Sequence, residues 1–150
     1  KSGGDGIGCT RVGKGVKIMI LVDAKGLPVA ACSTPANPAE SHLIQQLFGF
    51  MIAQSTPARV IGDKAYDSDR LDELLAAQGV EMIAPNRLNR SQTQDGRALR
   101  RSKRRWTVER TIAWLQNYRR LCIRWEKSHL AFQGFLHMAC ALLLIKEVLG

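Results

Sequence analysis

The sequence has few acidic residues for its size, and the shortage lies in one segment. Its 150 residues include 22 Lys and Arg but 13 Asp and Glu, a formal charge of +9. Residues 87–127 hold 11 Arg, 2 Lys and 3 acids, so this segment carries +10 and the rest of the chain −1. Because Arg suits bidentate phosphate contacts, the segment favours a polyanion such as nucleic acid as partner. The alternative is a solvated, solubilising face.

Cysteine and histidine are too scattered to form a metal site or a disulfide framework. The four cysteines, at positions 9, 32, 122 and 140, contain no C-x-x-C pair, and none has a His at zinc-finger spacing. The three histidines form no metal-binding motif, so we interpret them as structural or surface residues. Cys32 and Cys140 stand in apolar runs and are predicted to be small core residues. A reducing cytosol is the compartment expected for such a chain.

Long hydrophobic runs and an N-terminal leader are also lacking. The longest apolar run, Met138–Ile145, is shorter than the roughly 20 residues that a membrane span needs, and predicts a buried helix. Lys1 is followed by Gly-rich sequence without a signal-peptide core. Since the chain does not begin with Met, we expect it to be part of a longer product.

The apolar pattern predicts an α/β fold with a mixed sheet flanked by helices. Predicted strands span residues 17–23, 27–32, 59–63 and 80–84, the first two forming a hairpin. Predicted helices span residues 40–53, 69–78 and 130–149, and another begins at Arg105. We expect one domain over residues 1–150, with a flexible Gly-rich lead-in over 1–15 and a basic loop or arm over 86–104.

Two acids stand out by their position. Asp63 ends a predicted buried strand, and sites in α/β sheets gather at the carboxyl ends of strands. Glu109 is the only acid between Gly96 and Trp125 and has Arg neighbours. It either pairs with those Arg side chains or joins Asp63 in binding a divalent metal. Carboxylate oxygens are hard ligands suited to Mg²⁺, and two-metal sites promote attack on phosphodiesters.

For the other acids and for two of the tryptophans, we favour a structural role over a functional one. Asp23 is followed by Ala-Lys-Gly, which is good turn chemistry. Trp106 and Trp114 either pack in the core, which we favour, or stack on bases. Three acids around the start of the helix at 69–78 are predicted to cap it: Asp67, Asp69 and Asp72.

At these positions the sequence resembles a known family. Residues 61–68, Ile-Gly-Asp-Lys-Ala-Tyr-Asp-Ser, and residues 104–121, which contain Trp-Thr-Val-Glu-Arg-Thr-Ile-Ala-Trp-Leu, are similar to DDE transposases of bacterial insertion sequences, in the insertion-sequence-five group. The hairpin segment 22–28 and the segment 82–87 match as well. The resemblance covers nearly the whole chain, and the block around Glu109 is its most specific part.

The resemblance implies a ribonuclease-H-like fold, N-terminally truncated, with three carboxylates that hold two Mg²⁺ (or Mn²⁺) ions. Asp63 matches the second carboxylate and Glu109 the third, whereas the first belongs to a strand expected upstream of Lys1. Arg105 matches the motif's Arg, but Ser102 and Gln116 stand where the family often has Tyr and Lys.

The implied activity is Mg²⁺-dependent DNA cleavage and strand transfer in the bacterial cytoplasm, by a homodimer on double-stranded DNA. Because one carboxylate is missing, we expect this chain to bind DNA without strand transfer. The alternatives are a non-catalytic DNA-binding remnant, a ribonuclease-H-like nuclease or, more weakly, an RNA-associated protein. Predicted DNA contacts come from basic and aromatic side chains near both acids: Lys64, Tyr66, Arg100, Arg101, Arg104, Arg105, Arg110, Arg119 and Arg120.

Overall fold

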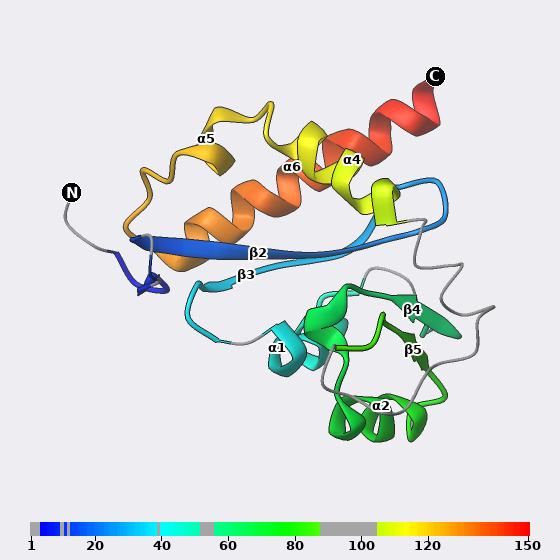
Figure 1. Ribbon diagram of the computed structural model, residues 1–150. Coiled ribbons are helices and arrows are strands. Elements are labelled where there is room, and N and C mark those ends of the chain that lie inside the picture. The colour runs from blue at the N-terminus through cyan, green and yellow to red at the C-terminus, as the bar shows by residue number, and fades with distance from the viewer. Residues whose placement is uncertain (1–3, 10, 12, 39, 52–55, 88–104) are drawn as a thin grey trace. The chain divides into compact units, whose positions relative to one another are not determined.

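The described part of the chain is an α/β protein with two compact units (Figure 1). The computed structural model describes residues 4–9, 11, 13–38, 40–51, 56–87 and 105–150. The first unit comprises residues 1–38, 44–52 and 107–150, and the second comprises residues 39–43 and 53–106. The described strands form a three-stranded sheet in the first unit and a two-stranded sheet in the second, and a single mixed sheet stays a prediction. From residue 88 on, the predicted arm at 86–104 lies outside the described residues.

The sheet of the first unit is antiparallel and contains the predicted hairpin. Strands β1 (Gly8–Cys9), β2 (Lys14–Val22) and β3 (Pro28–Pro35) follow one another in order. Asp23 makes the turn, because its Oδ1 accepts hydrogen bonds from the backbone N–H of Lys25 (2.9 Å) and of Leu27 (2.8 Å). The turn role predicted for Asp23 is therefore confirmed, and its carboxylate is engaged in shaping the hairpin.

A long helix lies along this sheet and closes the first core. Helix α6 (His129–Leu149) packs against β3, and α4 (Trp106–Leu115) and α5 (Arg119–Cys122) precede it in the chain. The predicted last helix is thus confirmed. The buried cluster between these elements consists of Ala31, Leu115, Leu136, Ala139 and Cys140.

Side chains of α6 satisfy backbone groups of β3 that β2 does not reach. Gln133 Oε1 accepts from Ser33 N–H at 2.6 Å, and its Nε2 donates to Ala31 O at 3.0 Å. His129 Nε2 lies 2.7 Å from Ser33 Oγ, and His137 Nε2 lies 2.9 Å from Ala31 O. Unpaired buried backbone groups are costly, so these bonds fix α6 on β3. The structural role predicted for histidines holds for both of these.

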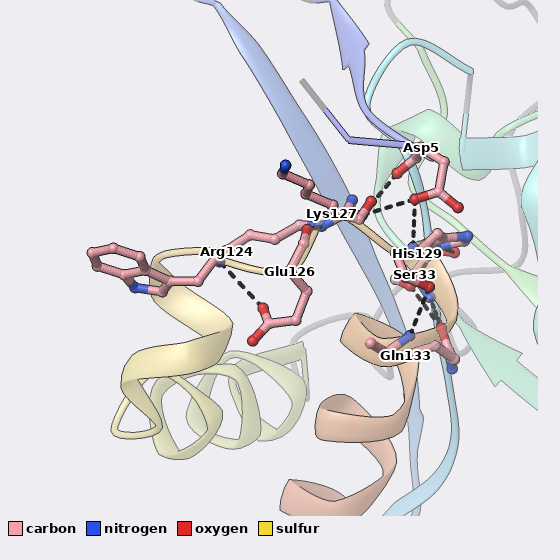
Figure 2. A network of polar contacts seen from close by, with 10 residues as sticks. Asp5, Ser33, Arg124, Glu126, Lys127, His129 and Gln133 are labelled. Atoms are coloured by element: carbon pink, nitrogen blue, oxygen red, sulfur yellow. Dashed lines mark hydrogen bonds and ion pairs between the residues drawn. The ribbon is translucent and has the colours of Figure 1, made fainter. Parts of the chain in front are cut away.

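The Gly-rich lead-in contacts the start of α6 (Figure 2). Asp5 Oδ1 accepts from the His129 N–H at 2.7 Å, and Arg124 Nη2 donates to Asp5 O at 2.7 Å. Gly6 has φ +66°, and a Cβ there would lie 2.6 Å from the His129 ring. The described residues of the lead-in include β1 and make these specific contacts, and the flexibility expected of residues 1–15 stays a prediction.

The second unit is built on a short parallel pair. Strands β4 (Arg59–Ile61) and β5 (Glu81–Ile83) pair in parallel, and α2 (Asp69–Ala76) packs on β5. Helix α1 (Glu40–Phe48) crosses the boundary between the units and ends before the predicted residue 53. Buried apolar side chains of this unit include Val60, Leu71, Leu75, Val80, Met82 and Ile83. Leu74 on α2 lies outside this core and is 41% exposed.

The cysteines divide into two buried and two exposed thiols, and the core positions predicted for Cys32 and Cys140 are confirmed. Cys32 and Cys140 are buried, and burial raises the pKa of each thiol to about 11. Both therefore stay neutral at physiological pH, which suits small core residues. Cys9 and Cys122 are exposed, and all four are free thiols.

Helix α6 is long and apolar enough, by length and composition alone, to cross a membrane. It is the one such helix among the described residues. The observed helix has 21 residues, longer than the apolar run that the sequence singled out. Core helices of soluble proteins meet the same criterion, and α6 carries buried polar side chains that bond to β3. These bonds indicate a helix of the protein core.

Candidate functional site

Asp63 lies directly after β4, at the carboxyl end of the parallel pair, where the sequence predicted it. It caps the short 3₁₀ helix η1 (Lys64–Tyr66), since its Oδ1 accepts from the Ala65 N–H at 2.8 Å. The side chain is half-buried. This cap fixes the carboxylate at the edge of the sheet, with Lys64 and Tyr66 on the same short turn.

Glycine before Asp63 allows neighbouring side chains to approach the backbone. A Cβ at Gly62 would lie 2.5 Å from Met82 Cε and 2.6 Å from the Tyr66 ring. The Gly62 N–H also donates to Ile83 O at 2.9 Å, which extends the β4–β5 pairing to the residue before the acid. Any larger side chain at position 62 would push Tyr66 or Met82 away and shift the turn that carries Asp63.

Arg87 holds the other side of this turn, a role that the sequence did not predict. Its backbone N–H donates to Asp67 Oδ2 at 2.6 Å, and its guanidinium donates to Lys64 O at 3.1 Å and Ala65 O at 3.0 Å. Asp67 is buried, so it anchors this segment rather than simply capping α2. Burial, together with the nearby charge of Asp67, raises the pKa of Asp72.

Glu109 is an exposed residue in the first turn of α4, where the helix dipole stabilises a negative charge. The opposite face of α4 is fixed on the hairpin turn. Thr111 is buried and its Oγ1 donates to Gly26 O at 2.5 Å. Gly26 has φ +89°, and a Cβ there would meet Thr107 and Thr111 at 3.2 Å, so glycine permits this contact. The hairpin turn therefore sets the orientation of Glu109.

Arg110, predicted to contact DNA, reaches back to the same turn. Its guanidinium donates to Lys25 O and lies over the Trp114 ring, 4.8 Å from the centroid. Trp114 is 36% exposed and Trp106 is 56% exposed, so the preference for core packing was wrong for Trp106 and holds only in part for Trp114. Arg110 thus supports α4 from the side next to Glu109.

Two of the predicted basic residues surround an open pocket beside α5. Arg119, Arg120 and Trp125 line a pocket of about 410 Å³. Trp125 is 67% exposed, and Arg120 forms an ion pair with Glu126 at 2.5 Å. Trp125 was not predicted from the sequence, although an aromatic residue next to Arg124 in the basic segment was a usable signal.

The remaining predicted residues fall partly outside the described part of the chain. Arg100, Arg101 and Arg104 lie outside it, and half-buried Arg105 directly precedes α4. Asp63 belongs to the second unit and Glu109 to the first, so a joint site of the two acids stays a prediction.

The two acids offer the right donor chemistry for a divalent metal, namely carboxylate oxygens. Within the described ranges, no three His, Cys, Asp or Glu side chains are grouped closely enough to hold a metal ion. Asp63 and Glu109 therefore account for two of the three carboxylates that the resemblance implies.

Comparison with known proteins identifies the family. Residues 5–144 match the family described as the transposase DDE domain. The chain belongs to the DDE transposase family. The matched residues of this DDE transposase chain include both Asp63 and Glu109. No solved structure matches it.

Two curated relatives of the DDE transposase chain are predicted transposases of insertion sequences. The chain is 35% identical over 144 residues to the one for element IS402 of Burkholderia cepacia, covering 89% of this chain and 64% of that protein. It is 33% identical over 138 residues to the one for element IS6501 of Brucella ovis, covering 87% of this chain and 98% of that protein. The chain therefore spans slightly less than two thirds of the first relative and nearly all of the second.

Proposed function

We propose that this chain carries the second and third catalytic carboxylates, Asp63 and Glu109, of an insertion-sequence transposase that cleaves DNA and transfers the cut strand. The observation that carries the proposal is the family match over residues 5–144, which contains both acids. The antiparallel hairpin of β2 and β3 and the parallel pair of β4 and β5 support a ribonuclease-H-like fold. The insertion-sequence-five group remains the expected subgroup.

Each acid is held by its own surroundings in a way that suits a catalytic group. The η1 cap and Arg87 restrain the turn of Asp63, and the Thr111–Gly26 bond restrains the helix of Glu109. Positioned carboxylates save reorganisation when substrate binds. Divalent ions, held by both carboxylates and a third upstream one, would supply an activated water or 3′-hydroxyl and stabilise the leaving oxygen.

A first prediction concerns the chain of 150 residues by itself. We expect it to bind a duplex of the element's terminal repeat but to nick it at no more than background rate in Mg²⁺, because it provides two of three carboxylates. Denaturing gels of an end-labelled duplex measure nicking, and a transposase that contains this chain together with the proposed upstream carboxylate serves as the active control. Efficient Mg²⁺-dependent cleavage by the 150-residue chain would contradict the incomplete-site proposal.

We propose that DNA contacts the pocket beside α5. We further propose that the protein acts as a dimer, which binds the double-stranded ends of the element and the double-stranded target. Arg119 is exposed there, and Arg120 and Trp125 complete the lining. Guanidinium groups bind phosphate oxygens, and an exposed indole offers a face for an unpaired base. The bacterial cytoplasm, where DNA is accessible, remains the expected location.

A second prediction is that this binding depends on phosphate contacts. Arg119→Ala should weaken binding to a terminal-repeat duplex and lower the slope of log K against log salt by about 1, the value for one lost contact. Fluorescence anisotropy across a salt series measures both quantities. The matched control is Arg70→Ala, since Arg70 is an exposed Arg on α2 outside the basic segment. An equal change in affinity and salt slope in the two variants would show that the pocket does not contact DNA.

A further inference from the structure

Helix α6 presents a broad apolar face that nothing in the first unit covers. One side of the helix is buried on β3 and α4, through Phe132, Leu136, Ala139 and Cys140. On the other side, five large apolar side chains are between 42% and 82% exposed: Met138, Leu142, Ile145, Val148 and Leu149. A contiguous exposed patch of this size marks an interaction surface.

The apolar side chains on this side of α6 follow the spacing of a helix–helix seam. Phe135 among them is half-buried, with the Arg120 guanidinium 5.4 Å from its ring centroid. Successive steps of four and three residues run along the helix, through Ala131, Phe135, Met138, Leu142, Ile145 and Leu149. This is the a/d repeat with which two helices pack side by side. We call this set the α6 seam. Gly134 and Ala141 flank it at seven-residue spacing, and a Cβ at Gly134 would meet open space, so a second helix can approach closely.

The α6 seam is also self-complementary. Its spacing is symmetric about residue 140, so an antiparallel copy would place Met138 against Leu142 and Phe135 against Ile145 of the second copy. No charged residue stands at a seam position, because Lys146 and Glu147 fall between Ile145 and Leu149 on other faces. Two-fold dimers require such an isologous patch.

The area available is sufficient for a specific dimer. Covering the exposed seam side chains and their exposed neighbour Val148 would bury roughly 500 Å² per copy, or about 1,000 Å² in total, the lower bound for a specific interface. We propose that the α6 seam is the contact through which two copies of this chain associate. The inference deepens the proposed homodimer, and it requires neither DNA nor cleavage.

Sedimentation equilibrium of the 150-residue chain without DNA tests the dimer. The wild type should sediment as a concentration-dependent dimer, and Leu142→Glu should raise the dimer dissociation constant at least tenfold. Leu74→Glu is the matched control, because Leu74 is a helical leucine of nearly equal exposure (41% against 42%) on α2. Far-UV circular dichroism checks folding, and Ile145→Gln provides a milder seam variant that should also weaken the dimer.

Three outcomes would overturn this interface. They are a monomeric wild type at about 100 µM, seam variants that dimerise like the wild type, and equal loss in Leu74→Glu. A monomeric wild type that co-sediments with phosphatidylcholine vesicles would assign the face to a lipid surface instead. Loss of the dimer leaves the cleavage proposal standing, since the nicking assay with the complete transposase measures cleavage separately.

Discussion

Asp63→Asn and Glu109→Gln are each expected to lower DNA cleavage by the complete transposase to which this chain is proposed to contribute on the order of 1,000-fold, or about 4 kcal/mol of transition-state stabilisation. Both substitutions keep the size of the side chain and remove the negative charge that metal binding requires. Asn at position 63 can still accept the hydrogen bond from the Ala65 N–H, so the η1 cap remains. The loss should therefore appear in cleavage and not in folding.

The measurement is the initial rate of Mg²⁺-dependent nicking, with duplex binding followed in parallel. Binding should change less than threefold, because neither acid belongs to the basic pocket. Asp69→Asn is the matched control, since Asp69 is an exposed acid in the first turn of α2. Nicking within tenfold of the wild type in either test variant would exclude that acid from catalysis, and equal loss in Asp69→Asn would indicate a nonspecific charge effect.

Local sequence patterns predicted which helices and strands form better than they predicted where those elements end and which of their sides are buried. The β2–β3 hairpin, α2 and α6 were recognised because apolar spacing and turn residues are local signals. The ends differed, since α1 stops at Phe48 and β3 continues to Pro35. The pattern also misjudged which sides are buried: α6 is apolar nearly all around, so its periodicity could not show that Ile145 and Val148 are exposed.

Sequence patterns identified the two acids of the candidate site, but not the residues that hold these acids in place. Asp63 and Glu109 stand out locally, one at a strand end and the other alone among bases. Arg87 is 20 residues from Asp67, and Gln133 is 100 residues from Ser33, so no local pattern links these pairs. The grouping of the strands into two sheets depends equally on long-range pairing, which composition and periodicity do not encode.

Gln133→Leu is expected to cost about 2 kcal/mol of folding free energy, because it leaves the buried Ser33 N–H without its acceptor. Leucine has similar volume, so the packing on β3 changes little. His137 Nε2 still lies within hydrogen-bond distance of Ala31 O, and His129 still contacts the Ser33 hydroxyl, which limits the damage mainly to one backbone group. The melting temperature should fall by roughly 4–8 °C for a chain of this length.

Thermal melts followed by far-UV circular dichroism measure this change. Gln45→Leu is the matched control, since Gln45 is an exposed glutamine on α1 and its replacement should shift the melt by less than about 2 °C. Because Gln133 lies on α6 and Ser33 on β3, the bond joins segments 100 residues apart. An unchanged melting temperature in Gln133→Leu would mean that apolar packing alone holds α6 on the sheet.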